Sequence, residues 1–246
     1  IECLGKITKS SRHLLGLINE VLDMARIESG KMSLAEEDFS LPELVDNLLT
    51  LTKPAIDEHK HNLEVHIDHI EHEAVCGDSL RIQQVFVNLM SNAIKYTQDG
   101  GNITFTIKEK KNGFSELGCY EFCIEDNGIG MTQEFQKIMF DPFSRADDHR
   151  TTKVQGTGLG MAITRNIVNL MNGSIKVDSI PNKGTKITVT VYLKLQESEK
   201  EQEKELFDLP VLVVDDDRIC CESTVATLQE IGIAGEWVLT GKEAVE

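Results

Sequence analysis

DSLRIQQVFVNLMSNAIKYT, residues 78–97, is the stretch of sequence that decides the fold of this chain. Its apolar residues recur every three or four positions, as on one face of an α-helix, and are Ile82, Val85, Phe86, Leu89, Ala93 and Ile94. Asn88 and Asn92 form a second stripe that continues to Lys95 and Tyr96. Amide oxygens suit Mg²⁺ and an ammonium group suits a polyphosphate, although a solvated polar face would show the same stripe. The stretch therefore predicts a helix with one buried face and one face of candidate ligands.

EDNGIGM, residues 125–131, follows a predicted strand from Cys119 to Glu125 in which every second residue is apolar. Asp126 then lies at the end of the strand, where a carboxylate can accept a hydrogen bond from an exocyclic amine such as that of adenine. Gly128 and Gly130 allow the backbone to bend and to approach a flat ligand closely. On its own, an Asp-Asn-Gly sequence is also typical of a simple turn.

GTGLGMA, residues 156–162, opens another predicted helix. Glycines at 156, 158 and 160 leave backbone N–H groups bare at the helix N-terminus, an arrangement that binds phosphate. A glycine-rich helix start is ambiguous when it stands alone. The three segments together, in this order, are a much stronger signal.

The three segments resemble the N, G1 and G2 boxes of the GHKL ATPase superfamily, in its sensor histidine kinase branch. The segment from Phe135 to Phe143 resembles the F box of that branch, and Gly184-Thr185 resembles its last glycine box. The resemblance covers roughly residues 12–195. It implies an α/β two-layer sandwich, the GHKL or Bergerat ATP-binding fold, with a mixed sheet and helices on one face.

The resemblance also implies a set of ligands for ATP and Mg²⁺. Asn92 would ligate Mg²⁺, Asp126 would bind adenine, and Lys95 and Tyr96 would reach the phosphates. The other implied ATP-binding residues are Asn88, Gly128, Gly130, Gly156, Thr157, Gly158, Leu159, Gly160 and Thr185. Residues 141–155 would form a mobile ATP lid.

Asn88 bears on the reaction. In hydrolysing relatives such as gyrase, the corresponding residue is a glutamate that activates water. The amide of Asn88 cannot take up a proton in this way. Asn88 therefore favours a phosphoryl acceptor other than water. The resemblance thus implies a protein histidine kinase of two-component signal transduction, which transfers the γ-phosphoryl group of Mg-ATP to a histidine for relay to a receiver aspartate. The alternatives are a nucleotide-binding and dimerisation module without turnover in this truncated form, and a self-contained ATPase, against which Asn88 counts.

Residues 1–34 resemble the second helix of the dimerisation and histidine-phosphotransfer domain. This implies a homodimer through the helix in the intact protein, with the phosphotransfer helix and the receiver domain as further partners. The first helix, which carries the acceptor histidine in the family, is expected outside the chain. His13 is followed by Leu-Leu-Gly and not by the acidic, basic and proline residues of the family motif, so we assign no catalytic residue here.

Residues 35–196 are predicted to be the ATP-binding domain and residues 197–208 a charged linker. Residues 209–246 resemble the start of a receiver domain, because the apolar strand 211–214 ends in acidic residues. In that family Asp215 and Asp216 would help to bind Mg²⁺, in a site that is incomplete without the phospho-acceptor aspartate expected beyond residue 246. An ordinary strand with an acidic end is the alternative.

The composition fits a soluble globular protein, with 40% hydrophobic and 27% charged residues among 246. A formal net charge of −16 argues against nucleic acid as a partner, because phosphate backbones require a basic footprint. The six cysteines show no paired metal-binding spacing, and no apolar run approaches the length of a membrane span. We therefore expect a cytoplasmic piece of a longer protein, with any membrane anchor outside these residues.

Overall fold

The computed structural model describes residues 2–111, 116–145, 157–196, 211–230 and 234–244. The chain divides into two compact units, residues 1–196 and 197–246, and each is described by itself. The boundary between the two predicted domains within the first unit, at residues 34 and 35, stays a prediction, as do the linker and receiver assignments.

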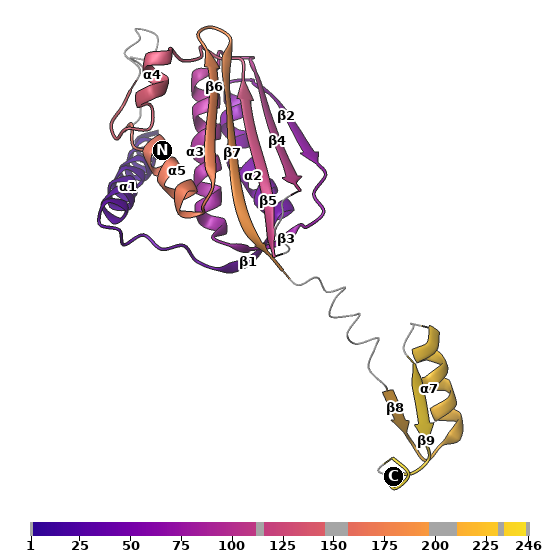
Figure 1. Cartoon of the computed structure of the whole chain (residues 1–246). Coiled ribbons are helices and arrows are strands. Elements are labelled where there is room, and N and C mark those ends of the chain that lie inside the picture. Colours follow the sequence, from indigo (N-terminus) through magenta and orange to yellow (C-terminus); the bar gives the residue numbers. More distant parts are fainter. Residues whose placement is uncertain (1, 112–115, 146–156, 197–210, 231–233, 245–246) are drawn as a thin grey trace. The chain divides into compact units, whose positions relative to one another are not determined.

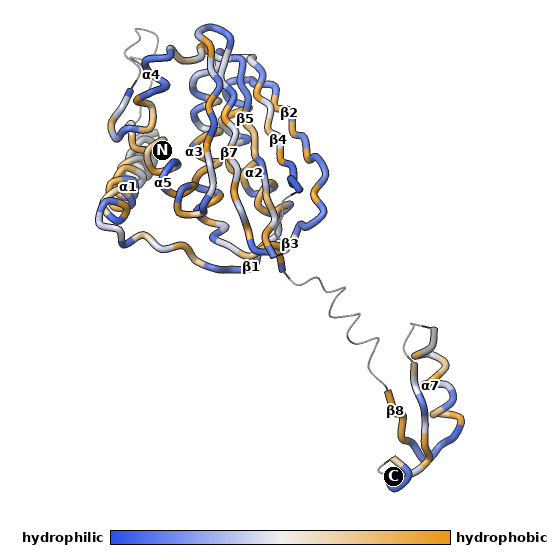
Figure 2. The backbone as a smooth tube through the Cα atoms, in the orientation of Figure 1, coloured by the Kyte–Doolittle hydropathy of each residue, from blue (hydrophilic) through white to orange (hydrophobic). Residues whose placement is uncertain are grey.

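A mixed seven-stranded sheet forms the centre of the first unit (Figure 1). Its strands are β1 (Glu37–Ser40), β2 (Asn62–Asp68), β3 (Ala74–Gly77), β4 (Asn102–Lys110), β5 (Leu117–Asp126), β6 (Ser174–Ile180) and β7 (Gly184–Leu195). The strand order is β1-β3-β7-β5-β4-β2, and β6 pairs with β7 as well. β2 and β4 run parallel, while the other pairs are antiparallel. In Figure 2 hydrophilic and hydrophobic residues alternate along β7, as expected for a sheet that buries one face.

The helices of the first unit are α1 (Glu2–Glu28), α2 (Leu41–Glu58), α3 (Ser79–Tyr96), α4 (Gln133–Ile138) and α5 (Gly160–Leu170). α2, α3 and α5 form a layer on one face of the sheet (Figure 1). The core lies between the two layers, where Phe86 of α3 packs against Phe105 and Phe122 of the sheet with ring centroids 6.3 and 4.3 Å away. The predicted α/β two-layer sandwich with a mixed sheet is confirmed.

Helix starts follow the local signals in the sequence. The Ser40 hydroxyl accepts a hydrogen bond from the backbone N–H of Glu43 at the start of α2, and the Asp78 carboxylate accepts one from Arg81 at the start of α3. β1 and β3 were not predicted, because each has only four residues and neither shows a clear alternation. Asn112-Gly113, a residue pair typical of a tight hairpin turn, lies outside the described residues.

The second unit contains a parallel pair of strands, β8 (Val211–Val214) and β9 (Gly235–Val238), and the helix α7 (Arg218–Glu230). Cys221 and Val225 of α7 are its buried hydrophobic residues among those described. In the described part of the chain as a whole, no helix combines the length and the apolar character needed to cross a membrane.

Candidate functional site

A pocket of about 490 Å³ lies in the first unit, where α3, the end of β5 and the start of α5 meet. This volume is within the range of small-molecule sites in proteins, roughly 300–1,000 Å³. Its lining includes predicted residues from all three sequence segments and from β7, namely Asn88, Asn92, Lys95, Tyr96, Asp126, Gly130, Thr157, Gly158, Gly160 and Thr185. Gly128 and Leu159 do not line the pocket, and Gly156 lies outside the described residues. The roles of these residues stay predictions.

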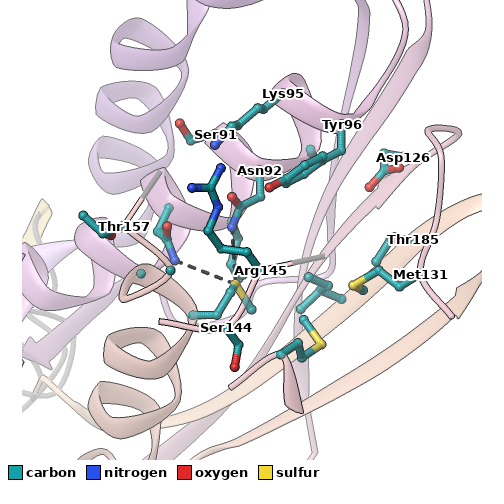
Figure 3. A pocket seen from close by; sticks show the side chains of 18 of the residues that line it. Ser91, Asn92, Lys95, Tyr96, Asp126, Met131, Ser144, Arg145, Thr157 and Thr185 are labelled. Atoms are coloured by element: carbon teal, nitrogen blue, oxygen red, sulfur yellow. Dashed lines mark hydrogen bonds between the residues drawn. The ribbon is translucent and has the colours of Figure 1, made fainter. Parts of the chain in front are cut away.

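Figure 3 separates two ends of this pocket. Asp126, Thr185 and Met131 lie on one side, which we call the Asp126 end. Thr157 lies on the opposite side, and the side chains of Asn92 and Arg145 lie between them. We call the region lined by Asn88, Asn92, Lys95, Arg145 and Thr157 the amide end.

At the Asp126 end, a partly buried carboxylate is tied to the backbone. The N–H of Gly128 donates to Oδ1 of Asp126 over 2.9 Å. Burial raises the pKa of Asp126, and the neighbouring Glu125 adds to this, whereas hydrogen bonds from the backbone of Gly128 and Thr185 oppose it. A carboxylate withdrawn from water in this way gains from a ligand that donates a hydrogen bond to it.

The glycines of the second segment let the loop pass close to other parts of the chain. A Cβ on Gly128 would lie 2.4 Å from the backbone oxygen of Tyr96. Gly130 has a φ of +63°, and a Cβ there would lie 2.0 Å from the oxygen of Ile180. These glycines therefore allow the loop to pack closely against the protein's own backbone, and not only against a ligand.

At the amide end, α5 holds the side chains of α3. Nδ2 of Asn88 donates to Oγ1 of Thr164 over 2.8 Å. Nδ2 of Asn92 donates to Sδ of Met161 over 3.3 Å, which leaves its Oδ1 for another ligand. Gly160 makes room for this packing, because a Cβ there would lie 2.4 Å from Oδ1 of Asn88.

Two cations and a hydroxyl complete the amide end. Partial burial and the guanidinium of Arg145 lower the pKa of Lys95, while the carboxylate of Glu20 acts in the opposite direction. The hydroxyl of Thr157 donates to Oε2 of Glu20 and accepts from the N–H of Leu159 over 3.1 Å. Burial raises the pKa of Tyr96, so its hydroxyl stays protonated and able to donate. The pocket thus offers donors and cations to an anion at one end and an acceptor to an amine at the other.

Sequence reasoning missed two groups of residues that line this pocket. The first comes from α1 and consists of Gly16, Leu17 and Glu20. The second is apolar and includes Met131, Phe135, Met139 and Met161. Glu20 lies on a helix that the sequence assigns to dimerisation. Nothing in the sequence around it distinguishes it from an ordinary solvent-exposed glutamate. The methionines equally match ordinary core residues.

The acidic residues of the second unit follow β8, as predicted. Oδ1 of Asp215 accepts a hydrogen bond from the N–H of Asp217 over 2.8 Å. Among the described residues, no three or more His, Cys, Asp or Glu side chains gather as metal ligands would. The magnesium site at Asp215 and Asp216 stays a prediction.

Known proteins resemble this chain over most of its length. Residues 77–197 match the family described as histidine kinase-, DNA gyrase B-, and HSP90-like ATPase. The sensor protein GacS of Pseudomonas syringae pv. syringae is 34% identical over 199 residues, which are 81% of this chain and 22% of GacS. The autoinducer 2 sensor kinase/phosphatase LuxQ of Vibrio vulnificus is 30% identical over an alignment of 248 positions, which covers 98% of this chain and 29% of LuxQ. This chain therefore spans less than a third of the length of either relative.

A solved structure shows the same fold. The crystal structure of full-length ShkA in complex with AMPPNP superposes with a TM-score of 0.65 at 20% sequence identity. The match covers 96% of this chain and 48% of ShkA.

Proposed function

Because residues 77–197 form a domain of the histidine kinase-, DNA gyrase B- and HSP90-like ATPase family, with the GHKL fold, we propose that this chain binds Mg-ATP and transfers its γ-phosphoryl group to a histidine. The acceptor histidine belongs to a phosphotransfer domain outside the chain, and in the intact protein a receiver aspartate takes the group next. The relative LuxQ, a sensor kinase/phosphatase, and the AMPPNP bound by ShkA support this proposal.

One observation carries the proposal, namely that the three sequence segments converge on one pocket with chemically different ends. Asp126 would accept a hydrogen bond from the amine of adenine, and Ile129 and Ile187 line the same pocket as apolar walls. At the amide end, Lys95 and Arg145 would hold phosphate oxygens and orient the transferred group. ATP combines a flat base with a polyanion and matches both ends.

The residues present also fit magnesium. Asn92 would hold it through its amide oxygen, because its Nδ2 is already engaged by Met161. Bound Mg²⁺ would neutralise charge on the phosphates. Asn88 cannot act as a base toward water, which leaves an external nucleophile such as histidine as the acceptor.

The remaining assignments follow from this proposal. We assign α1 to the dimerisation and phosphotransfer domain, where it would pair with a second copy. Its exposed apolar residues support this, and they are Leu14, Leu15, Ile18, Val21 and Leu22. The second unit would be the start of a receiver domain.

Transfer can be tested by mixing the chain with Mg-ATP and a separately made first-helix segment that carries the histidine. We expect phosphate on that segment, and none when its histidine is replaced by glutamine. Nucleotide binding without transfer would favour a binding module instead. Steady release of phosphate without the segment would favour a self-contained ATPase.

A further inference from the structure

The helix α1 places a carboxylate at the amide end of the pocket. Gly16, Leu17 and Glu20 line the pocket, and Oε2 of Glu20 accepts the hydrogen bond of the Thr157 hydroxyl. We propose that Glu20 is an internal competitor of the nucleotide phosphates, which must displace it before they engage this end of the site. The inference rests on the proposed function and adds a form of regulation to it.

Competition follows from the hydrogen-bond capacity of Thr157. A hydroxyl has one proton to donate, and here that proton goes to Glu20. The oxygen of the same hydroxyl accepts from the N–H of Leu159 over 3.1 Å, which fixes its direction. A phosphate oxygen and a carboxylate oxygen are acceptors of the same kind, so the hydroxyl serves one of them at a time.

Charge acts in the same sense. Glu20 interacts electrostatically with Lys95, the cation assigned to the phosphates. A polyphosphate that enters the pocket brings further negative charge next to this carboxylate, and like charges at short distance repel each other. Removal of the Glu20 carboxylate therefore leaves the Thr157 hydroxyl to the nucleotide and takes a negative charge away from the neighbourhood of Lys95.

A second contact one turn further along α1 holds Glu20 in place. Asp23 is only 8% exposed, and its Oδ2 accepts from Nη1 of Arg81 and from Nε2 of Gln84, each over 2.9 Å. A buried charge that is paired in this way is costly to expose. The contact of Asp23 with Arg81 and Gln84 thus keeps Glu20 at a high local concentration beside Thr157. The hydrogen bond between Glu20 and Thr157 is the one that a phosphate can replace.

The test compares Mg-ATP with adenosine, which has the base but no phosphates. Calorimetry on the whole chain gives the affinity of both ligands for the wild type, Glu20→Ala and Glu28→Ala. Glu28 is an exposed glutamate on the same helix and serves as the matched control. We expect Glu20→Ala to bind Mg-ATP roughly three- to tenfold more tightly, with adenosine unchanged and Glu28→Ala equal to the wild type.

The opposite results are equally clear. If Glu20→Ala bound Mg-ATP no more tightly than the wild type, the inference would be overturned. The proposed function would still stand, because the chain would still bind the nucleotide. An equal gain for adenosine would also overturn it, because the effect would then not concern phosphate. If folded wild-type and variant chains bound neither ligand, the proposed function would fall together with the inference.

Discussion

The two ends of the pocket are built from different parts of the chain. At the Asp126 end, main-chain contacts set the geometry, such as the 2.9 Å bond from Gly128 N–H and the close passage of Gly130 past Ile180. At the amide end, side chains of α1, α3 and α5 hold one another, as Asn88 does with Thr164. The Asp126 end is therefore preorganised by the main chain before a ligand binds. At the amide end, a ligand has to fit around the existing hydrogen bonds between side chains or replace them. Changes at the Asp126 end should therefore affect every adenine ligand, and changes at the amide end only those with phosphates.

The strongest test of this difference is Asp126→Ala. Loss of the acceptor should weaken Mg-ATP and adenosine alike, by roughly 100-fold or more, because a donor on the base would be buried without a partner. Glu125→Ala is the control, since Glu125 is exposed and pairs with Lys186 over 2.8 Å. Titration calorimetry measures both ligands. Unaltered adenosine binding by Asp126→Ala would show that this end does not hold the base.

Asn92→Ala should separate the two ends. We expect roughly 10- to 100-fold weaker binding of Mg-ATP and no change for adenosine, because the variant loses the proposed metal ligand and a contact with Met161, both at the amide end. Removal of magnesium with a chelator should weaken wild-type binding of ATP and leave that of Asn92→Ala nearly unaffected. Asn47→Ala, at an exposed asparagine of α2, is the matched control. A loss of adenosine binding would contradict independent ends.

The pH dependence of adenosine binding should report on Asp126. The ionised carboxylate is the form that accepts from the amine, so affinity should fall as pH decreases through the pKa of Asp126 in the free protein. Because burial raises that pKa, the fall should begin at a higher pH than for an ordinary aspartate and approach tenfold for each pH unit below it. Adenosine is the suitable ligand because it lacks phosphates that titrate. Asp126→Asn should flatten the profile, and the same slope in that variant would point to another group.

The difference between the ends also explains what the sequence could predict. α3 spans residues 79–96, close to the predicted stretch, because periodicity and the Asp78 cap are local features. Asp126 could be placed at the end of a strand for the same reason. Contacts between distant segments left no local trace, such as those of Asn88 with Thr164, 76 residues away, and of Thr157 with Glu20, 137 residues away. The family resemblance supplied candidate roles for the α3 residues but not the partners that hold them.

Thr164→Val tests one of those unforeseen contacts and should have the smallest effect. Thr164 is 1% exposed, and valine keeps its shape while removing the oxygen that accepts from Asn88. We expect a loss of about 1 kcal/mol in the free energy of unfolding, because the Asn88 amide loses a partner in a partly buried place. Mg-ATP should bind a few-fold more weakly, since Asn88 is then less well oriented, and adenosine should bind as before.

Chemical denaturation measures the free energy of unfolding of Thr164→Val, and calorimetry measures its affinity for the two ligands. Thr50→Val, at an exposed position of α2, controls for the exchange of a hydroxyl for a methyl group. If adenosine were weakened as much as Mg-ATP, the contact between α3 and α5 would support the whole pocket and not one end of it. If stability fell without any change in Mg-ATP binding, Thr164 would serve the fold alone. Thr164 contacts the amide end, through Asn88. The two ends are therefore independent only if Thr164→Val changes the affinity for Mg-ATP and not the affinity for adenosine.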